Sequence, residues 1–298
     1  MTGTAQLESR CELIPGAPST GEQRVTDATG RAPEEHPRDA HPAGVCAAAR
    51  IRAAHHGRAT TLPVLHSDGP FHLRRLRPCG ARARVTVIGA MSAPLGGDRL
   101  VLDVAAGARA ELAMTTAAST IALRGPTTDP ATYDVRLSVG EQASLHWLPQ
   151  PVINTCGSTL HQTYDVELAP TSRLLLREEQ VLGRTAEPPG HLTTRLTVRR
   201  DAQLILEQHT SYGGPAPAWD GPAILGQHRA TGQLLVVEPD MDPTHEPLFI
   251  GDNPAEGCAV VAPLAKGEAM LATAVASTPA HLRRLLDAAF THIVSART

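Results

Sequence analysis

The chain has 298 residues, of which 42% are hydrophobic, and its formal net charge at pH 7 is −3. This length suffices to bury one large core or two smaller ones. Aromatic residues make up only 3% and the charged residues are dispersed, which argues against aromatic stacking platforms and against a basic surface for nucleic acid.

Residues 1–43 are rich in Pro, Gly, Thr, Glu and Arg and have no hydrophobic periodicity, so we predict a disordered N-terminal extension followed by a β domain over 44–298. The N-terminus has no secretion-signal pattern, and no apolar stretch approaches the roughly 18 residues of a membrane span. Five widely spaced cysteines without a C-x-x-C pair indicate reduced thiols. We therefore expect a cytoplasmic protein that binds neither membrane nor nucleic acid.

A repeated unit between Leu100 and His209 is the strongest pattern in the chain. Its four copies read LVLDVAAGARAEL, TYDVRLSVGEQASLHWL, TYDVELAPTSRLLL and TTRLTVRRDAQLIL. Each is an alternating strand, a short turn and a second alternating strand, and the turn anchors are Gly107, Gly140, Pro170 and Asp201. A near-constant period of about 31 residues predicts a mainly β fold of stacked, β-helix-like strands.

Further strands are predicted on both sides of the repeat, whereas a proline-rich segment at 213–226 is predicted to be a loop. The predicted flanking strands lie within 45–54, 59–67, 81–90, 228–239, 257–267 and 268–277.

The C-terminal segment predicts a helix over about 279–294. Thr278 is a suitable N-cap and Pro279 suits the first helical position. The residues Leu282, Leu285, Leu286, Ala289 and Ile293 form one apolar stripe. We expect the stripe to pack on the β body, with docking of a partner as the alternative.

Two local motifs carry polar residues that could have a function. In LGGDRLVLDV (95–104), Gly96-Gly97 permits a tight turn that Asp98 can cap, and alone a plain hairpin turn is favoured over a functional carboxylate. In LHWLPQPVINTCG (145–157), two prolines stop a strand beside polar side chains. An edge strand that leaves the sheet, with Trp147 in the core, explains this second motif equally well.

The ordered motifs of the chain resemble the UreD (UreH) family of urease accessory proteins, of which it would be a divergent member. The matching elements are Gly96-Gly97-Asp98-Arg99-Leu100, Thr115-Thr116-Ala117-Ala118-Ser119, Leu145 with Trp147-Leu148-Pro149-Gln150-Pro151, and Leu182-Gly183-Arg184. The chain departs from the family at His146, where the family usually has glutamate, and at 121–124, where the family tends to a Lys-x-Tyr-Arg pattern.

The resemblance implies a non-catalytic scaffold for urease maturation, without a tightly bound cofactor. Family members bind apo-urease and the accessory protein UreF, which recruits the GTPase UreG, and this accessory complex can dimerise. They pass Ni²⁺ to the urease active site through an internal channel. On this reading Asp98 and His146 contact nickel in transit. The remaining motif residues are then structural: Gly96, Gly97, Arg99, Thr115, Thr116, Trp147, Pro149, Gln150, Gly183 and Arg184.

Two other functions are compatible with parts of the sequence. The repeat alone would suit a β-helical carbohydrate-active enzyme. Such an enzyme needs clustered carboxylates and sugar-binding aromatic residues and usually has a secretion signal, and in this sequence these features are sparse or lacking. The apolar helix stripe would suit a generic protein-interaction module.

Overall fold

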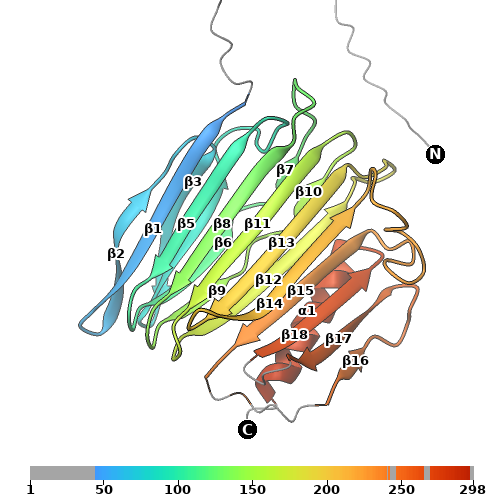
Figure 1. The fold of residues 1–298 in the computed structure, drawn as a ribbon. Helices are drawn as coiled ribbons and strands as arrows, with labels where there is room; N and C mark the ends of the chain where they lie inside the picture. The colour runs from blue at the N-terminus through green and yellow to red at the C-terminus, as the bar shows by residue number, and fades with distance from the viewer. Residues whose placement is uncertain (1–43, 240, 242–245, 265–268, 296–298) are drawn as a thin grey trace, which may run out of the picture. The chain divides into compact units, whose positions relative to one another are not determined.

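The structure, a computed structural model, describes residues 44–239, 241, 246–264 and 269–295. The extension predicted over 1–43 lies outside these residues. The described chain is mainly β, with stacked strands and a C-terminal helix, which confirms the predicted fold class (Figure 1). Its described part contains no helix that is both long and apolar enough to span a bilayer.

The described strands form two sheets. The first sheet has the order β14-β13-β11-β8-β5-β1-β2. Its strands are β1 (Cys46–His56), β2 (Ala59–His66), β5 (Arg99–Ala106), β8 (Ala131–Val139), β11 (Thr159–Leu168), β13 (His191–Arg200) and β14 (Gln203–Tyr212).

The second sheet has the order β16-β17-β18-β15-β12-β9-β6-β4-β3, and the short strands β7 and β10 pair beside β12. Its strands are β3 (Phe71–Cys79), β4 (Arg82–Gly89), β6 (Glu111–Thr116), β7 (Thr120–Ala122), β9 (Ser144–Trp147), β10 (Val152–Asn154), β12 (Arg173–Leu182), β15 (Ala230–Val237), β16 (Leu248–Ile250), β17 (Gly257–Pro263) and β18 (Ala269–Ala276).

The first three repeat units are coils that cross from one sheet to the other. Strands β5, β8 and β11 pair in parallel in the first sheet, and β6, β9 and β12 pair in parallel in the second. Strict alternation turns every second side chain inward, and these side chains form the core between the sheets. Trp147 belongs to this core, with 2% of its surface exposed.

The fourth repeat unit is different, because β13 and β14 form an antiparallel hairpin within the first sheet. The connection is only two residues long, and Asp201 and Ala202 both have positive φ, at 49° and 58°. Two positive φ values match the short turn that joins antiparallel strands. The hairpin therefore ends the series of coils.

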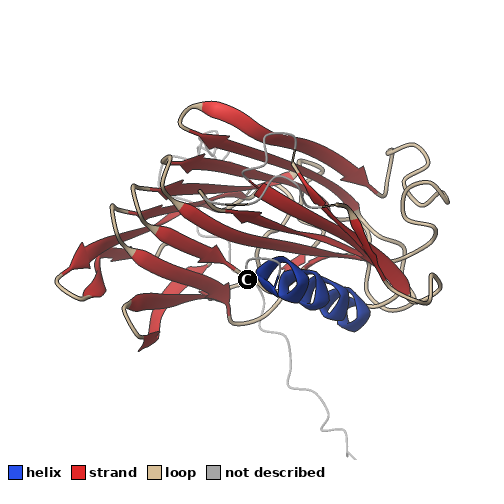
Figure 2. Ribbon diagram, turned by 90° about the horizontal axis from the view of Figure 1, so that it is seen from below, coloured by secondary structure: helices blue, strands red, loops and turns tan. Residues whose placement is uncertain are grey.

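Helix α1 (Pro279–Ser295) lies on the outer face of the second sheet, against β15, β17 and β18 (Figure 2). As predicted, the Thr278 hydroxyl caps it by accepting a hydrogen bond from the His281 N–H, at 3.2 Å. Leu282, Leu286 and Ala289 are fully buried against the sheet. Packing on the β body is thus confirmed, and docking of a partner on the stripe is wrong.

Candidate functional site

Asp98 lies in the turn that leads into β5, and its side chain is 1% exposed. Its carboxylate accepts two backbone hydrogen bonds, from the N–H of Val45 at 2.7 Å and from the N–H of Leu95 at 2.8 Å. Strands β4 and β5 belong to different sheets, so the expected hairpin turn is instead a crossover between sheets. Asp98 fastens this crossover to the segment preceding β1.

Gly96 and Gly97 meet two separate steric demands in this crossover. Gly97 has a φ of 92°, which favours glycine. Gly96 lies against Gly125 of the next coil, where a Cβ on Gly125 would come within 2.4 Å of the Gly96 nitrogen. Arg99 begins β5 with an exposed side chain. The first motif therefore holds the turns of consecutive coils in close contact.

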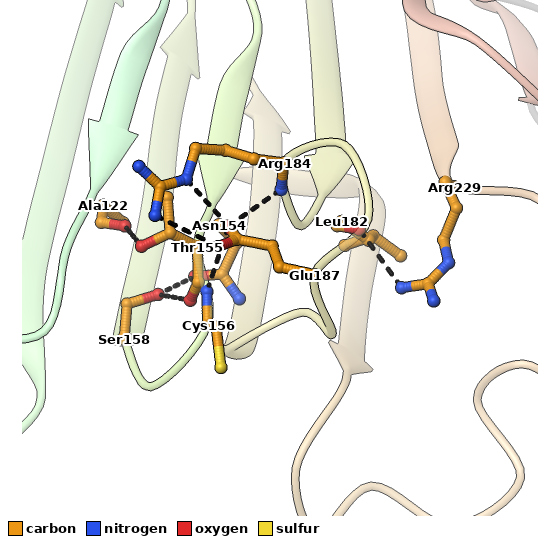
Figure 3. Close-up of polar contacts among 9 residues, drawn as sticks. All are labelled: Ala122, Asn154, Thr155, Cys156, Ser158, Leu182, Arg184, Glu187 and Arg229. Atoms are coloured by element: carbon orange, nitrogen blue, oxygen red, sulfur yellow. Dashed lines mark hydrogen bonds and ion pairs between the residues drawn. The ribbon is translucent and has the colours of Figure 1, made fainter.

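The Leu182-Gly183-Arg184 motif forms a turn at the same end of the coils (Figure 3). Arg184 forms an ion pair with Glu187 at 3.0 Å, and the Glu187 carboxylate also accepts the backbone N–H groups of Arg184 and Cys156. These hydrogen bonds, led by the one from the Arg184 side chain, lower the pKa of Glu187 to about 2. Gly183 has a φ of 84°. This motif thus links two neighbouring turns.

The Pro149-Gln150-Pro151 segment interrupts a central strand, since β9 pairs with both β6 and β12. The predicted edge strand is therefore wrong, although Trp147 does pack into the core as expected. The Gln150 N–H donates to the Thr116 hydroxyl at 2.9 Å, and the neighbouring coil has its own interruption between β6 and β7. Thr115 precedes Thr116 on β6 and is half-buried. Two motifs of the chain are thus aligned in adjacent coils.

An ion-pair cluster lies on β12 beside this interruption. Glu179 has a side chain that is 1% exposed, and it pairs with Arg283 of α1 at 2.6 Å and with Arg177 at 2.9 Å. Arg177 pairs in turn with Asp287 of α1 at 3.1 Å. Burial raises the pKa of Glu179 while the two arginines lower it. The cluster joins the helix to the outer face of the second sheet.

Glu178 points the opposite way, into the space between the sheets, because neighbouring strand residues face opposite sides. It accepts a hydrogen bond from the Gln233 amide. Its neighbours are polar side chains that share this inner face, and together they form a polar band through the core. The polar band consists of Gln162, Tyr164, Glu178, Gln180, Thr194, Thr210, Thr231 and Gln233.

The polar band reaches a pocket of about 330 Å³ between the two sheets, to which Gln180, Thr194 and Gln233 contribute. Within the band, one side-chain oxygen each of Gln162, Glu178 and Gln233 is buried without a hydrogen-bond partner among the described residues. Buried acceptors without partners are rare in native proteins and call for a water molecule or an ion. The band therefore offers several oxygen atoms that could bind a ligand between the two sheets.

Burial raises the pKa of Glu178 to about 7, although the hydrogen bond from Gln233 acts in the opposite direction. Its folded-state pKa thus lies above the usual value of 4.5. Between these pH values the folded protein keeps a proton that the unfolded chain releases. This contribution to stability is complete below pH 4.5 and is lost as the pH rises through about 7.

We expect Glu178→Gln to remove this pH dependence and to raise the free energy of unfolding above neutral pH by roughly 1–3 kcal/mol. Urea unfolding on either side of this window, near pH 4 and pH 8, measures the change in the free energy of unfolding. Glu167→Gln, which changes an exposed carboxylate on β11, is the matched control and should leave the slope unchanged. If the free energy of unfolding of Glu178→Gln changed with pH as much as that of the parent, Glu178 would not be the group with the raised pKa.

His146 lies on the outer face of the second sheet, because its strand neighbours Leu145 and Trp147 point into the core. Burial, together with the charge of Arg82, lowers its pKa to about 4, so the imidazole is neutral at pH 7. Asp98 is instead part of a crossover turn, and the structure does not bring the two residues together. No three His, Cys, Asp or Glu side chains converge as a metal site within the described ranges. Contact of either residue with nickel stays a prediction.

The polar band is the feature that sequence reasoning missed. Its signal is present in the repeat: Gln162 and Thr194 occupy positions where the alternation of β11 and β13 calls for an apolar residue. In β12 the acids Glu178 and Glu179 are adjacent, so the pattern does not reveal which one faces inward.

These features define a class of protein, a coiled β scaffold with a polar interior that runs between its two sheets. The family of UreD urease accessory proteins matches residues 45–297 of the chain. The chain belongs to this family, and its role is in urease maturation, where it works with urease and other accessory proteins.

Individual relatives agree with this assignment. The chain is 62% identical to urease accessory protein UreD 2 of Saccharopolyspora erythraea over 245 residues, which are 82% of this chain and 86% of the relative. It is 50% identical to UreD 3 of Streptomyces griseus, over 84% of this chain and 97% of the relative. It is also 50% identical to urease accessory protein UreD of Streptomyces coelicolor, over 83% of this chain and 96% of the relative.

Proposed function

We propose that the chain is a non-catalytic cytoplasmic scaffold that binds apo-urease and a UreF-type protein, and through it a UreG-type GTPase, and that Ni²⁺ crosses its interior on the way to urease. The observation that carries the nickel route is the polar band, with its unpaired buried oxygens around Glu178. Carboxylate and amide oxygens are not the ligands that nickel prefers, which suits an ion that must move on.

Glu178 is the carboxylic acid of the polar band, so its ionised form is the group there that attracts a divalent cation most strongly. An approaching Ni²⁺ favours the ionised carboxylate, which burial alone makes costly. Binding of the ion should thus release a proton near neutral pH. The amide oxygens of Gln162 and Gln233 can then share the ion without a full set of strong ligands.

The carbohydrate-active alternative receives no support from the buried acids. A glycosidase needs two carboxyl groups that flank one sugar bond. Glu178 points between the sheets, whereas Glu179 points outward to the arginines beneath α1. The two acids therefore cannot face a common substrate.

The proposed function is tested by co-expressing urease subunits and the other accessory proteins with and without this chain. We expect urease without the chain to contain little nickel and to be inactive. Unchanged nickel content and activity would overturn the function. The route is tested by Glu178→Gln, which should lower nickel per urease active site several-fold while the chain still co-purifies with its partners. Glu167→Gln is the control, and full nickel loading in Glu178→Gln would overturn the route alone.

A further inference from the structure

A groove on the outer face of the second sheet is separate from the polar band and has a volume of about 410 Å³. It lies over the beginnings of β4, β6, β9 and β12, next to the C-terminal part of α1. We call it the arginine groove, after two of its polar residues. These polar residues include Arg82, Glu111, Ser144, His146, Arg173 and Glu238.

Arg173 supplies an available positive charge in this groove. Its side chain is exposed, and this side chain forms no ion pair or hydrogen bond with any residue that the structure describes. Arg82 is only partly neutralised, because its ion pair with Glu111 is long, at 3.6 Å. A guanidinium offers a planar fork of donors that matches a carboxylate.

Two further donors are buried in the groove without a partner in the described part of the chain, the Arg82 Nε and the Ser144 hydroxyl. A buried donor without a partner is unfavourable, so a ligand oxygen that accepts a hydrogen bond from it is favoured. His146 is neutral and can donate one ring N–H. The polar side of the groove is therefore rich in donors.

The opposite side of the groove is apolar. Leu175 and Val236 are buried at its floor, and Phe290 of α1 is 37% exposed at its edge. Such a surface suits a short carbon skeleton rather than an inorganic ion. The acids Glu111 and Glu238 also face the groove, which disfavours a densely charged ligand such as a polyphosphate.

We propose that the arginine groove binds a small organic acid with two carboxylate groups, with Arg173 and Arg82 as its anchors. One carboxylate of the ligand forms an ion pair with Arg173. The other carboxylate replaces Glu111 as the partner of Arg82 and accepts a hydrogen bond from the Ser144 hydroxyl. The carbon chain packs on Leu175 and Val236. This site is separate from the polar band, since it lies on the other face of the second sheet.

Titration of the full chain with succinate tests the site, by calorimetry and by the ring resonances of His146. We expect saturable binding with one succinate per chain, weaker binding of inorganic phosphate and no binding of the neutral analogue succinamide.

Arg173→Gln should weaken succinate binding about tenfold or more, because it removes a charge-assisted contact. Arg136→Gln is the matched control, since Arg136 is an exposed arginine of β8 on the first sheet. Equal weakening in both variants would overturn the site in favour of general charge attraction. Phosphate binding as tight as that of succinate, or succinate binding that leaves the His146 resonances unmoved, would also overturn it.

Discussion

Asp98→Ala should lower the free energy of unfolding by about 3–5 kcal/mol, since two hydrogen bonds to a buried carboxylate are lost together. The N–H groups of Val45 and Leu95 would remain without an acceptor in the crossover turn. Asp98→Asn retains one acceptor oxygen and should fall between the parent and the alanine variant. Urea unfolding at pH 7 measures the series.

Asp103→Ala is the control for this series, because Asp103 is a partly exposed acid of β5, the strand that follows Asp98. Its ion pair with Arg52 should contribute at most about 1 kcal/mol. If Asp98→Ala keeps the parental stability but fails to activate urease, the carboxylate acts in nickel passage and not as a turn cap. The experiment thus also decides the nickel role predicted for Asp98.

Glu179→Ala should cost about 3–5 kcal/mol, since it leaves two largely buried guanidinium groups without their shared carboxylate. Arg177 keeps its ion pair with Asp287, whereas among the described residues Arg283 keeps only a contact of 3.4 Å with the Gln150 side chain. Helix α1 should then detach more readily, which limited proteolysis near the C-terminus would detect together with urea unfolding.

Glu207→Ala is the comparison for Glu179→Ala, because the Glu207–Arg195 pair is about half exposed on both sides. Exposed pairs contribute about 0–1 kcal/mol. A loss in Glu179→Ala no larger than that in Glu207→Ala would show that the cluster on β12 does not hold the helix.

The coiled architecture could be predicted from the sequence because the inward positions of the repeat are mostly apolar and recur at a steady period. The hairpin of the fourth unit could also be predicted, but from the length of its turn. The first three units change sheets through four residues, as at 107–110, whereas 201–202 provides only two. A connection of two residues returns the strand to its own sheet.

The site was less predictable, because it depends on how consecutive coils align. Asp98 could be recognised as a turn cap from its local sequence, but its partner Val45 lies 53 residues away. Gln150 and Thr116 meet only because the interruptions of two coils coincide. The pairing of Glu179 with Arg283 requires the helix to be placed, and no local pattern specifies that placement.

The hairpin β13–β14 also has a consequence for the behaviour of the protein in a crowded cell. A parallel stack of coils exposes a strand edge on which another chain can add, and long edges of this kind promote aggregation. Because β14 runs antiparallel to β13, it breaks the parallel direction that a further coil would need. Its exposed Glu207 and His209 place polar side chains on that last strand. These features therefore disfavour the addition of a further parallel coil at this edge.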